Sequence, residues 1–245
     1  MLLKTEKLIA IFPAQEAAMD NAVLLSIQDV SSFYVSRNFA LFGKKHIKPV
    51  LDHINLELKT GEILGLTGKS GCGKTTLAKC ILGIIEYEGK ILIDGKDLKN
   101  KSMQAQMVFQ EPGASLNPVK KIGWLMEEPL IIHKIGTPQE RRRKTNEMLE
   151  RVGLDPSYKT RRVHELSGGQ KQRVCIARAL ILSPRLLIAD EAISALDVST
   201  GAQILNLFRE LHSGLGLSVL FISHNKDAVE YLCDRIAVME NGRVY

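Results

Sequence analysis

Residues 68–75 read Gly-Lys-Ser-Gly-Cys-Gly-Lys-Thr, and they fit the pattern G-x-x-x-x-G-K-[ST] at every fixed position. This pattern is typical of a loop that binds the phosphates of a nucleotide. The apolar run Ile63–Thr67 before it is suited to a buried strand, and Leu77, Ile81 and Ile85 recur at helical spacing after it. The stretch therefore predicts a strand, a phosphate loop and a helix, in that order.

The residue types in this loop suit a nucleoside triphosphate. Glycines at 68, 71 and 73 let the backbone turn tightly and bring its N–H groups onto the β- and γ-phosphate oxygens, at the positive end of the helix that follows. Lys74 adds a positive charge, and Thr75 offers a hydroxyl to Mg²⁺. A glycine-rich turn without a ligand is the alternative. We expect nucleotide contacts from Gly68, Ser70, Gly71, Cys72, Gly73, Lys74, Thr75 and Thr76.

Composition and charge are those of an ordinary globular protein. The 245 residues are 45% hydrophobic, which is enough for one large α/β domain or two small ones. Lysine and arginine exceed aspartate and glutamate by 33 to 27, a net charge of +6. This excess is compatible with phosphate ligands, acidic membrane surfaces or nucleic acid, and charge alone does not choose among them. A solvated basic surface that serves solubility is the simplest account of most of these residues.

The spacing of cysteine and histidine indicates neither a zinc site nor a disulfide framework. The cysteines, at 72, 80, 175 and 233, form no C-x-x-C pair, and the six histidines form no cluster at metal-ligand spacing. Free thiols fit a reducing cytosol. No apolar run approaches the ~20 residues needed to cross a bilayer. If the protein works at a membrane, we expect another chain to span it.

The first 21 residues differ from the rest of the chain. The apolar patch Leu8–Phe12 before Pro13 resembles a weak signal peptide, but Glu6 precedes it and Met19 lies just ahead of the first good strand pattern. We therefore expect an N-terminal extension, or an ambiguity of the start site, over residues 1–21. The folded domain is expected over residues 22–245.

Strand and helix patterns alternate along this domain. From Glu111 to about Arg162 the chain changes to proline-punctuated loops and helical stretches, which predicts a helical lobe. Its charged run, residues 139–144, reads as a solvated helix face, with contact to lipid or a partner as the alternative. The remaining alternation indicates a mainly parallel sheet with helices on both faces. Strands are expected at Val23–Val30 with a continuation over 33–35, Val50–Leu58 after a basic loop from Arg37 to Lys48, Ile63–Thr67, Gly89–Gly95, Met107–Phe109, Leu186–Ala189, Ser218–Ile222 and Ile236–Met239.

Two further motifs make the phosphate loop specific. The apolar strand Leu186–Ala189 ends in Asp190 and Glu191. In phosphate-loop ATPases such a strand carries one carboxylate for the Mg²⁺ shell and one for the attacking water, although two acids at a strand end can be a simple cap. The pentapeptide Leu166–Gln170, Leu-Ser-Gly-Gly-Gln, precedes them by about twenty residues. It is the signature of ATP-binding-cassette ATPases, and the chain resembles that family from about residue 23 to residue 245.

The resemblance assigns further roles by position. Tyr34 looks like the aromatic that stacks on adenine, with Phe33 as the rival if the strand register differs. Gln110 matches the glutamine that approaches Mg²⁺ and senses a transmembrane partner, and His224 matches the switch histidine near the γ-phosphate. The resemblance thus implies catalytic roles for Lys74, Gln110, Glu191 and His224, and an Mg²⁺ site of Thr75, Gln110 and Asp190. It also implies contacts to the nucleotide of a second cassette from Ser167, Gly168, Gly169, Gln170 and Asp197. Asp197 belongs to a turn, residues 194–197, that the resemblance places at the dimer interface.

The fold class implied is α/β. It combines a phosphate-loop ATPase core, with a mainly parallel sheet and an antiparallel β subdomain, and a helical subdomain that carries the signature. We place the core at about residues 22–110 and 178–245 and the helical subdomain at about 111–177.

A finer resemblance points to importers. Residues 110–112, Gln-Glu-Pro, and 115–118, Ser-Leu-Asn-Pro, look like the ATPase subunits of dipeptide, oligopeptide and nickel importers. Residues 68–72, 173–175 and 190–192 resemble the nickel type more than the peptide type. Ala192 and Ile193 depart from the Pro-Thr of most relatives without removing a catalytic group. Because the sequence stops at Tyr245, without the extension of many peptide-importer subunits, we expect neither an iron–sulfur cluster nor a regulatory tail.

The function implied is hydrolysis of MgATP to energise uptake of nickel, a related metal chelate or short peptides. The implied partners are a second cassette, either identical or a paralogue, two membrane permease subunits and, indirectly, an extracellular solute-binding protein. The implied location is the cytoplasmic face of the membrane, without nucleic acid. The alternative is a soluble cassette acting on nucleic acid or ribosomes, but such relatives generally carry two cassettes or a coiled-coil insertion. An inactive scaffold is disfavoured because Lys74, Ser167, Asp190, Glu191 and His224 are all present.

Overall fold

The computed structural model describes residues 22–37, 45–97 and 103–245. The segment 1–21, for which the sequence left an extension or a start-site ambiguity open, lies outside these residues. Among the described helices, none combines the length and hydropathy that a membrane span requires.

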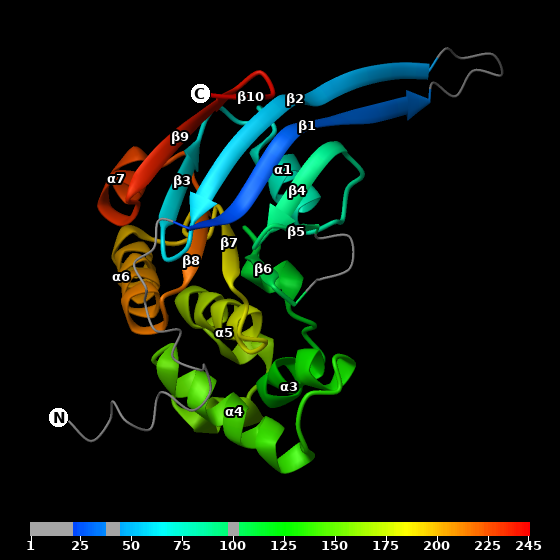
Figure 1. The fold of residues 1–245 in the computed structure, drawn as a ribbon. Helices are drawn as coiled ribbons and strands as arrows, with labels where there is room; N and C mark the ends of the chain where they lie inside the picture. The colour runs from blue at the N-terminus through cyan, green and yellow to red at the C-terminus, as the bar shows by residue number, and fades with distance from the viewer. Residues whose placement is uncertain (1–21, 38–44, 98–102) are drawn as a thin grey trace.

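An antiparallel sheet of order β2-β1-β4-β5 is formed by β1 (Val23–Arg37), β2 (Lys45–Lys59), β4 (Glu88–Ile93) and β5 (Lys96–Asp97). The basic loop predicted from Arg37 to Lys48 is shorter than expected, because Lys45–Lys48 already pair with β1. Figure 1 shows the two strands running on together as a ribbon beyond the rest of the sheet. These two stretches pair through backbone hydrogen bonds.

A second sheet, of order β10-β9-β3-β8-β7-β6, is parallel except at its β9–β10 edge. It comprises β3 (Ile63–Thr67), β6 (Ala105–Val108), β7 (Leu186–Asp190), β8 (Ser218–Ile222), β9 (Arg235–Glu240) and β10 (Arg243–Val244). Leu66 and Asp190 both pair with Ile222 of β8, the central strand of the three. The register therefore brings the carboxyl ends of β3, β7 and β8 to one edge of the sheet.

Two apolar cores lie on the two faces of this parallel sheet. Alternate residues of a strand enter different cores: Leu64 and Leu66 pack with the antiparallel sheet and α1 (Lys74–Ile81), while Ile63 packs on the helical side. The helical side holds α5 (Gly168–Leu180), α6 (Val198–Leu215) and α7 (Lys226–Leu232). Both faces of the sheet are thus covered, as the continuous apolar strands predicted.

The first helix ends earlier than its apolar spacing indicated. Ile85 lies beyond α1, which stops at Ile81 before Gly83, a residue with a left-handed φ of 69°. Ile85 still packs, half-buried, against the core beside α1. The helical spacing of Ile85 from Ile81 therefore indicated that its side chain is buried, and not that the helix continues to residue 85.

Short helices fill residues 112–165, and α5 follows them. They are α2 (Pro112–Ser115), α3 (Ile122–Ile132), α4 (Pro138–Arg151) and the 3-10 turns η3 (Pro156–Thr160) and η4 (Val163–Glu165). The start of α4 is set by a capping box of Thr137 and Glu140, with Pro138 in the first turn. In the charged run, Arg142 and Arg143 are exposed while Lys144 is half-buried. Since α5 crosses residues 177 and 178, our boundary there stays a proposal.

Candidate nucleotide site

The phosphate loop has a shape that only glycine fits at two positions. A Cβ on Gly68, where φ is 151°, would lie 2.2 Å from the carbonyl oxygen of Met239. A Cβ on Gly73, where φ is 117°, would lie 2.8 Å from the Met239 side chain and 3.0 Å from the carbonyl oxygen of Val50. The loop is therefore pressed against Val50 of β2 and the end of β9, and both glycines are required by close approach as well as by conformation.

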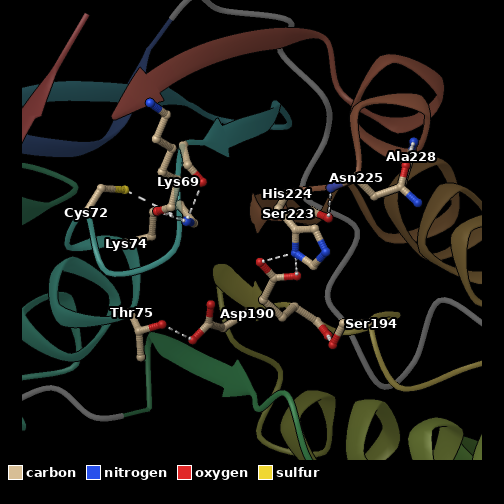
Figure 2. A network of polar contacts seen from close by, with 12 residues as sticks. Lys69, Cys72, Lys74, Thr75, Asp190, Ser194, Ser223, His224, Asn225 and Ala228 are labelled. Atoms are coloured by element: carbon tan, nitrogen blue, oxygen red, sulfur yellow. Dashed lines mark hydrogen bonds and ion pairs between the residues drawn. The ribbon is translucent and has the colours of Figure 1, made fainter. Parts of the chain in front are cut away.

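Lys74, the first residue of α1, points back into the loop (Figure 2). Its ammonium donates to the carbonyl oxygens of Gly68 at 2.8 Å and Lys69 at 3.1 Å, and it lies 3.8 Å from the Cys72 sulfur. The residue is only 7% exposed. A positive charge is thus held inside the loop, where phosphate oxygens would be attracted to it.

Thr75 and Asp190 meet across the gap between α1 and β7 (Figure 2). The Thr75 hydroxyl donates to Oδ2 of Asp190 at 2.8 Å, while Oδ1 of Asp190 is buried and has no hydrogen-bond partner among the described residues. Burial raises the pKa of the Asp190 carboxyl. A carboxylate oxygen without a partner beside a hydroxyl is a donor set that fits Mg²⁺. Gln110, exposed at the end of β6, borders the same pocket.

Glu191 and His224 form a direct pair. Glu191 has a left-handed φ of 52°, and its N–H donates to the carbonyl oxygen of Ile222 at 2.9 Å. His224 Nδ1 lies 2.9 and 2.8 Å from the two Glu191 carboxylate oxygens. Because a carboxylate only accepts, Nδ1 carries the proton in this contact. Sequence placed the two residues at strand ends but did not predict that they touch.

One pocket of about 1080 Å³ gathers most of the predicted residues. Asp190, Glu191, Gln110 and His224 border it together with the phosphate loop, and residues 49–50 and 239–242 complete its wall. The pocket is also lined by every phosphate-loop residue that the sequence predicted to contact nucleotide: Gly68, Ser70, Gly71, Cys72, Gly73, Lys74, Thr75 and Thr76.

The turn at 241–242 is a part of the site that sequence reasoning missed. The Gly242 N–H donates to the Cys72 carbonyl at 3.1 Å, and the Gly242 carbonyl accepts from the Asp52 N–H at 2.9 Å. The turn therefore ties the phosphate loop to β2. Asn241-Gly242 was visible as a turn signal, but no local pattern indicates what a turn will touch.

The adenine contact is not tested by the geometry. Tyr34 lies in β1 opposite Lys48, and its side chain falls outside the described part of the structure. The rival, Phe33, is 43% exposed and is not among the described residues that line the pocket. Stacking of Tyr34 on adenine stays a prediction.

The signature residues lie apart from this pocket. Ser167 caps α5 by accepting from the Gln170 N–H at 3.3 Å, and Gln170 Oε1 accepts from the Ser167 N–H at 3.0 Å. Gly168 starts α5, and a Cβ on Gly169 would lie 2.5 Å from Cγ2 of Thr200. No residue of 167–170 borders the pocket within the described ranges.

Asp197 caps α6. It accepts from the Thr200 N–H at 2.9 Å, the Ser199 hydroxyl and the Thr200 hydroxyl, and these hydrogen bonds lower its pKa to about 2. Like the signature, Asp197 is not among the described residues around the pocket. The predicted site residues thus fall into two groups, one around the phosphate loop and one at the starts of α5 and α6.

Comparison with known proteins agrees with these features. The sequence profile of the ABC transporter family matches residues 51–194. The oligopeptide transport ATP-binding protein AppF of Bacillus subtilis is 44% identical over 239 residues, 93% of this chain and 72% of that protein. The dipeptide transport ATP-binding protein DppF of Haemophilus influenzae is 43% identical over 235 residues, 91% of this chain and 71% of that protein.

A solved structure has the same fold. It is the dimer of the ATP-binding cassette MJ0796 bound to ADP and Pi, with a TM-score of 0.77 and 29% identity, and it covers 90% of this chain and 96% of that one. The α/β architecture predicted from the motifs is confirmed by this likeness. The chain belongs to the ABC transporter family and is an ATPase subunit of that family.

Proposed function

We propose that the chain hydrolyses MgATP as the energising subunit of a binding-protein-dependent importer of short peptides. The observation that carries the proposal is the assembly of Lys74, Asp190 and the Glu191–His224 pair around one pocket beside the phosphate loop. The relatives AppF and DppF, which are named as oligopeptide and dipeptide transport proteins, favour peptides as the solute. Our sequence-based preference for nickel has no such support.

Each side chain has a distinct role in this proposal. Lys74 and the loop N–H groups bind the β- and γ-phosphates. Thr75, Asp190 and Gln110 hold Mg²⁺, which neutralises charge on the triphosphate when bound. Glu191 orients the attacking water and accepts its proton, while the Nδ1 proton of His224 keeps the Glu191 carboxylate turned toward the pocket.

A second cassette completes the site in this proposal. Ser167 and Gly169 offer a hydroxyl and an N–H, and neither residue is among the described residues that border the chain's own pocket. The Ser167 oxygen accepts from Gln170 N–H, so its hydroxyl proton stays available as a donor. Donors of this kind stabilise phosphate charge most effectively where water is excluded, as between two closed cassettes. The dimeric MJ0796 cassette is an example of such an assembly among similar proteins.

The test begins with an affinity tag on this chain, which is used to purify its complex from membranes of the cells that naturally make it. We expect two permease subunits and a cassette to copurify, and the cells to lose uptake of a labelled tripeptide when Lys74 is changed to Ala. Uptake of labelled Ni²⁺ in the same cells serves as the comparison. Loss of Ni²⁺ uptake with intact tripeptide uptake would contradict the peptide assignment. Copurification with ribosomes or nucleic acid in place of permeases would overturn the assignment of the chain to an importer.

A further inference from the structure

Tyr158, a residue outside the motifs identified in the sequence, contacts the signature directly. It lies on η3, and its hydroxyl oxygen accepts a hydrogen bond of 3.0 Å from Nε2 of Gln170. Gln170 Oε1 in turn accepts from the Ser167 N–H at 3.0 Å. The Gln170 amide therefore bridges Tyr158 and the residue that caps α5.

Hydrogen-bond chemistry fixes which way this amide faces. The Ser167 N–H is a donor, so the atom of Gln170 that faces it must be the carbonyl oxygen Oε1. The NH₂ group then points to Tyr158, whose phenolic oxygen is the acceptor. Without that acceptor the Gln170 side chain keeps its bond from the Ser167 N–H, while the second bond of the capping box, from the Gln170 N–H to Ser167 Oγ, is 3.3 Å long.

The Tyr158 ring is itself held in place. The Arg161 guanidinium lies 3.9 Å from the ring centroid, and the ring packs half-buried against the apolar core. The Arg161 carbonyl accepts from the Ile122 N–H at 2.9 Å, which joins η3 to the start of α3. A Cβ on Gly123 would lie 3.1 Å from the Lys159 carbonyl, so the two backbones are in close contact. Tyr158 is thus an anchored support and not a loose surface side chain.

We propose that Tyr158 is a positioning residue for ATP hydrolysis: through Gln170 it holds the Ser167 hydroxyl in the orientation that serves the nucleotide of the partner cassette. The proposal rests on the shared site proposed above. Tyr158 is not among the described residues that border the chain's own pocket, so its contribution concerns turnover in the assembly and not nucleotide binding by one chain.

The test compares two tyrosine-to-phenylalanine variants that remove equivalent groups. Tyr158→Phe deletes the hydroxyl and leaves the ring under Arg161. Tyr231→Phe is the matched control on α7, because the Tyr231 hydroxyl also bonds an amide side chain, that of Asn206 at 2.6 Å, and its ring also lies under an arginine, Arg209 at 4.4 Å. Both variants are measured in the complex purified from membranes, and their thermal midpoints are compared.

We expect Tyr158→Phe to lower kcat about threefold to tenfold, the effect of one lost hydrogen bond, with an unchanged KM for ATP. ATP binding by the isolated chain and the thermal midpoint should match those of Tyr231→Phe, which should keep normal kcat. In a Ser167→Ala background, Tyr158→Phe should lower kcat no further, because both changes act through one hydroxyl.

Three results separate failure of this inference from failure of the shared site. A normal kcat in Tyr158→Phe, where Ser167→Ala lowers kcat, overturns the role of Tyr158 and leaves the shared site standing. Additive losses in the double variant assign Tyr158 a merely structural role and also overturn the inference. Normal kcat in Ser167→Ala itself overturns the shared site, and the positioning role with it.

Discussion

Glu191 occupies a left-handed backbone conformation that an unbranched side chain tolerates and that directs its carboxylate to His224 and the pocket. Such a φ is uncommon outside glycine, and it persists here because the Glu191 N–H bonds the end of β8. The backbone position of residue 191 is therefore set by the hydrogen bond to β8, and a change of the side chain alone should leave the backbone there undisturbed.

Glu191→Gln should for this reason preserve ATP binding while lowering turnover by a factor on the order of 10² or more, since an amide cannot accept the proton of water. Steady-state hydrolysis in the purified complex and ATP titration of the isolated chain measure the two effects. Glu230→Gln, on the exposed surface of α7, is the control and should change neither. Near-normal hydrolysis by Glu191→Gln would remove Glu191 from the role of base.

Tyr34 is the residue whose assignment rests on sequence alone. Stacking on adenine is worth about 1 kcal/mol for an aromatic pair, so Tyr34→Ala should weaken ATP binding several-fold and Tyr34→Trp should hold it. Titration with ATP measures both. The exposed Phe33 gives the comparison: loss of affinity in Phe33→Ala with none in Tyr34→Ala would reverse the assignment.

The contact between the starts of α5 and α6 explains one glycine of the signature without reference to nucleotide. Thr200 is fixed, because its hydroxyl donates to Asp197 and its N–H bonds the same carboxylate. Its Cγ2 therefore cannot rotate away from the 2.5 Å approach that a Cβ on Gly169 would make. The close approach of α5 and α6 therefore requires a residue without a side chain at position 169.

Gly169→Ala should consequently destabilise the fold, even though alanine favours helix over glycine. Adding Thr200→Ser removes Cγ2 and keeps the hydroxyl, so the double variant should regain the thermal midpoint of the parent chain. Unfolding curves of the two single variants and the double variant test this. Equal loss of stability in Gly169→Ala and in the double variant would show that the contact with Thr200 is not the cause.

At the scale of the whole molecule, the two groups of site residues lie on separate elements: one at the edge of the parallel sheet, the other at the starts of α5 and α6. The first group lies around one pocket. The second, Ser167 and Asp197 among it, has its capping oxygens engaged within the chain and lies away from that pocket. In the shared site proposed above, each chain would contribute half of each of two sites.

We therefore predict that the isolated chain binds ATP as a monomer and hydrolyses it slowly, and that activity per chain rises when a partner cassette and the membrane subunits are supplied. Specific activity across a wide dilution series, with and without the partners, measures this. A high rate of ATP hydrolysis per chain that stays constant on dilution, from a species that sediments as a monomer, would contradict the shared-site mechanism.

Local sequence was sufficient for the phosphate loop and the strands around it. Residues 68–75 carry their own turn chemistry, and runs such as Leu186–Ala189 are apolar because both faces of the strand are covered. The resemblance to phosphate-loop ATPases also implied that Asp190 and Thr75 of the loop would share one Mg²⁺ site. These features depend on neighbours within a few residues, or on topology that the motifs imply.

Only the tertiary structure decided which side chains touch. Three contacts depend on the register of strands and the packing of turns. They are the Glu191–His224 pair, the backbone hydrogen bond from Gly242 to Cys72 and the hydrogen bond from Gln170 to Tyr158. The extension of β1 and β2 over Lys45–Lys48 was hidden for the same reason. Backbone hydrogen bonds and close contacts between distant segments carry no periodicity in sequence, so residue patterns determined the parts of the site and the fold alone determined how they are joined.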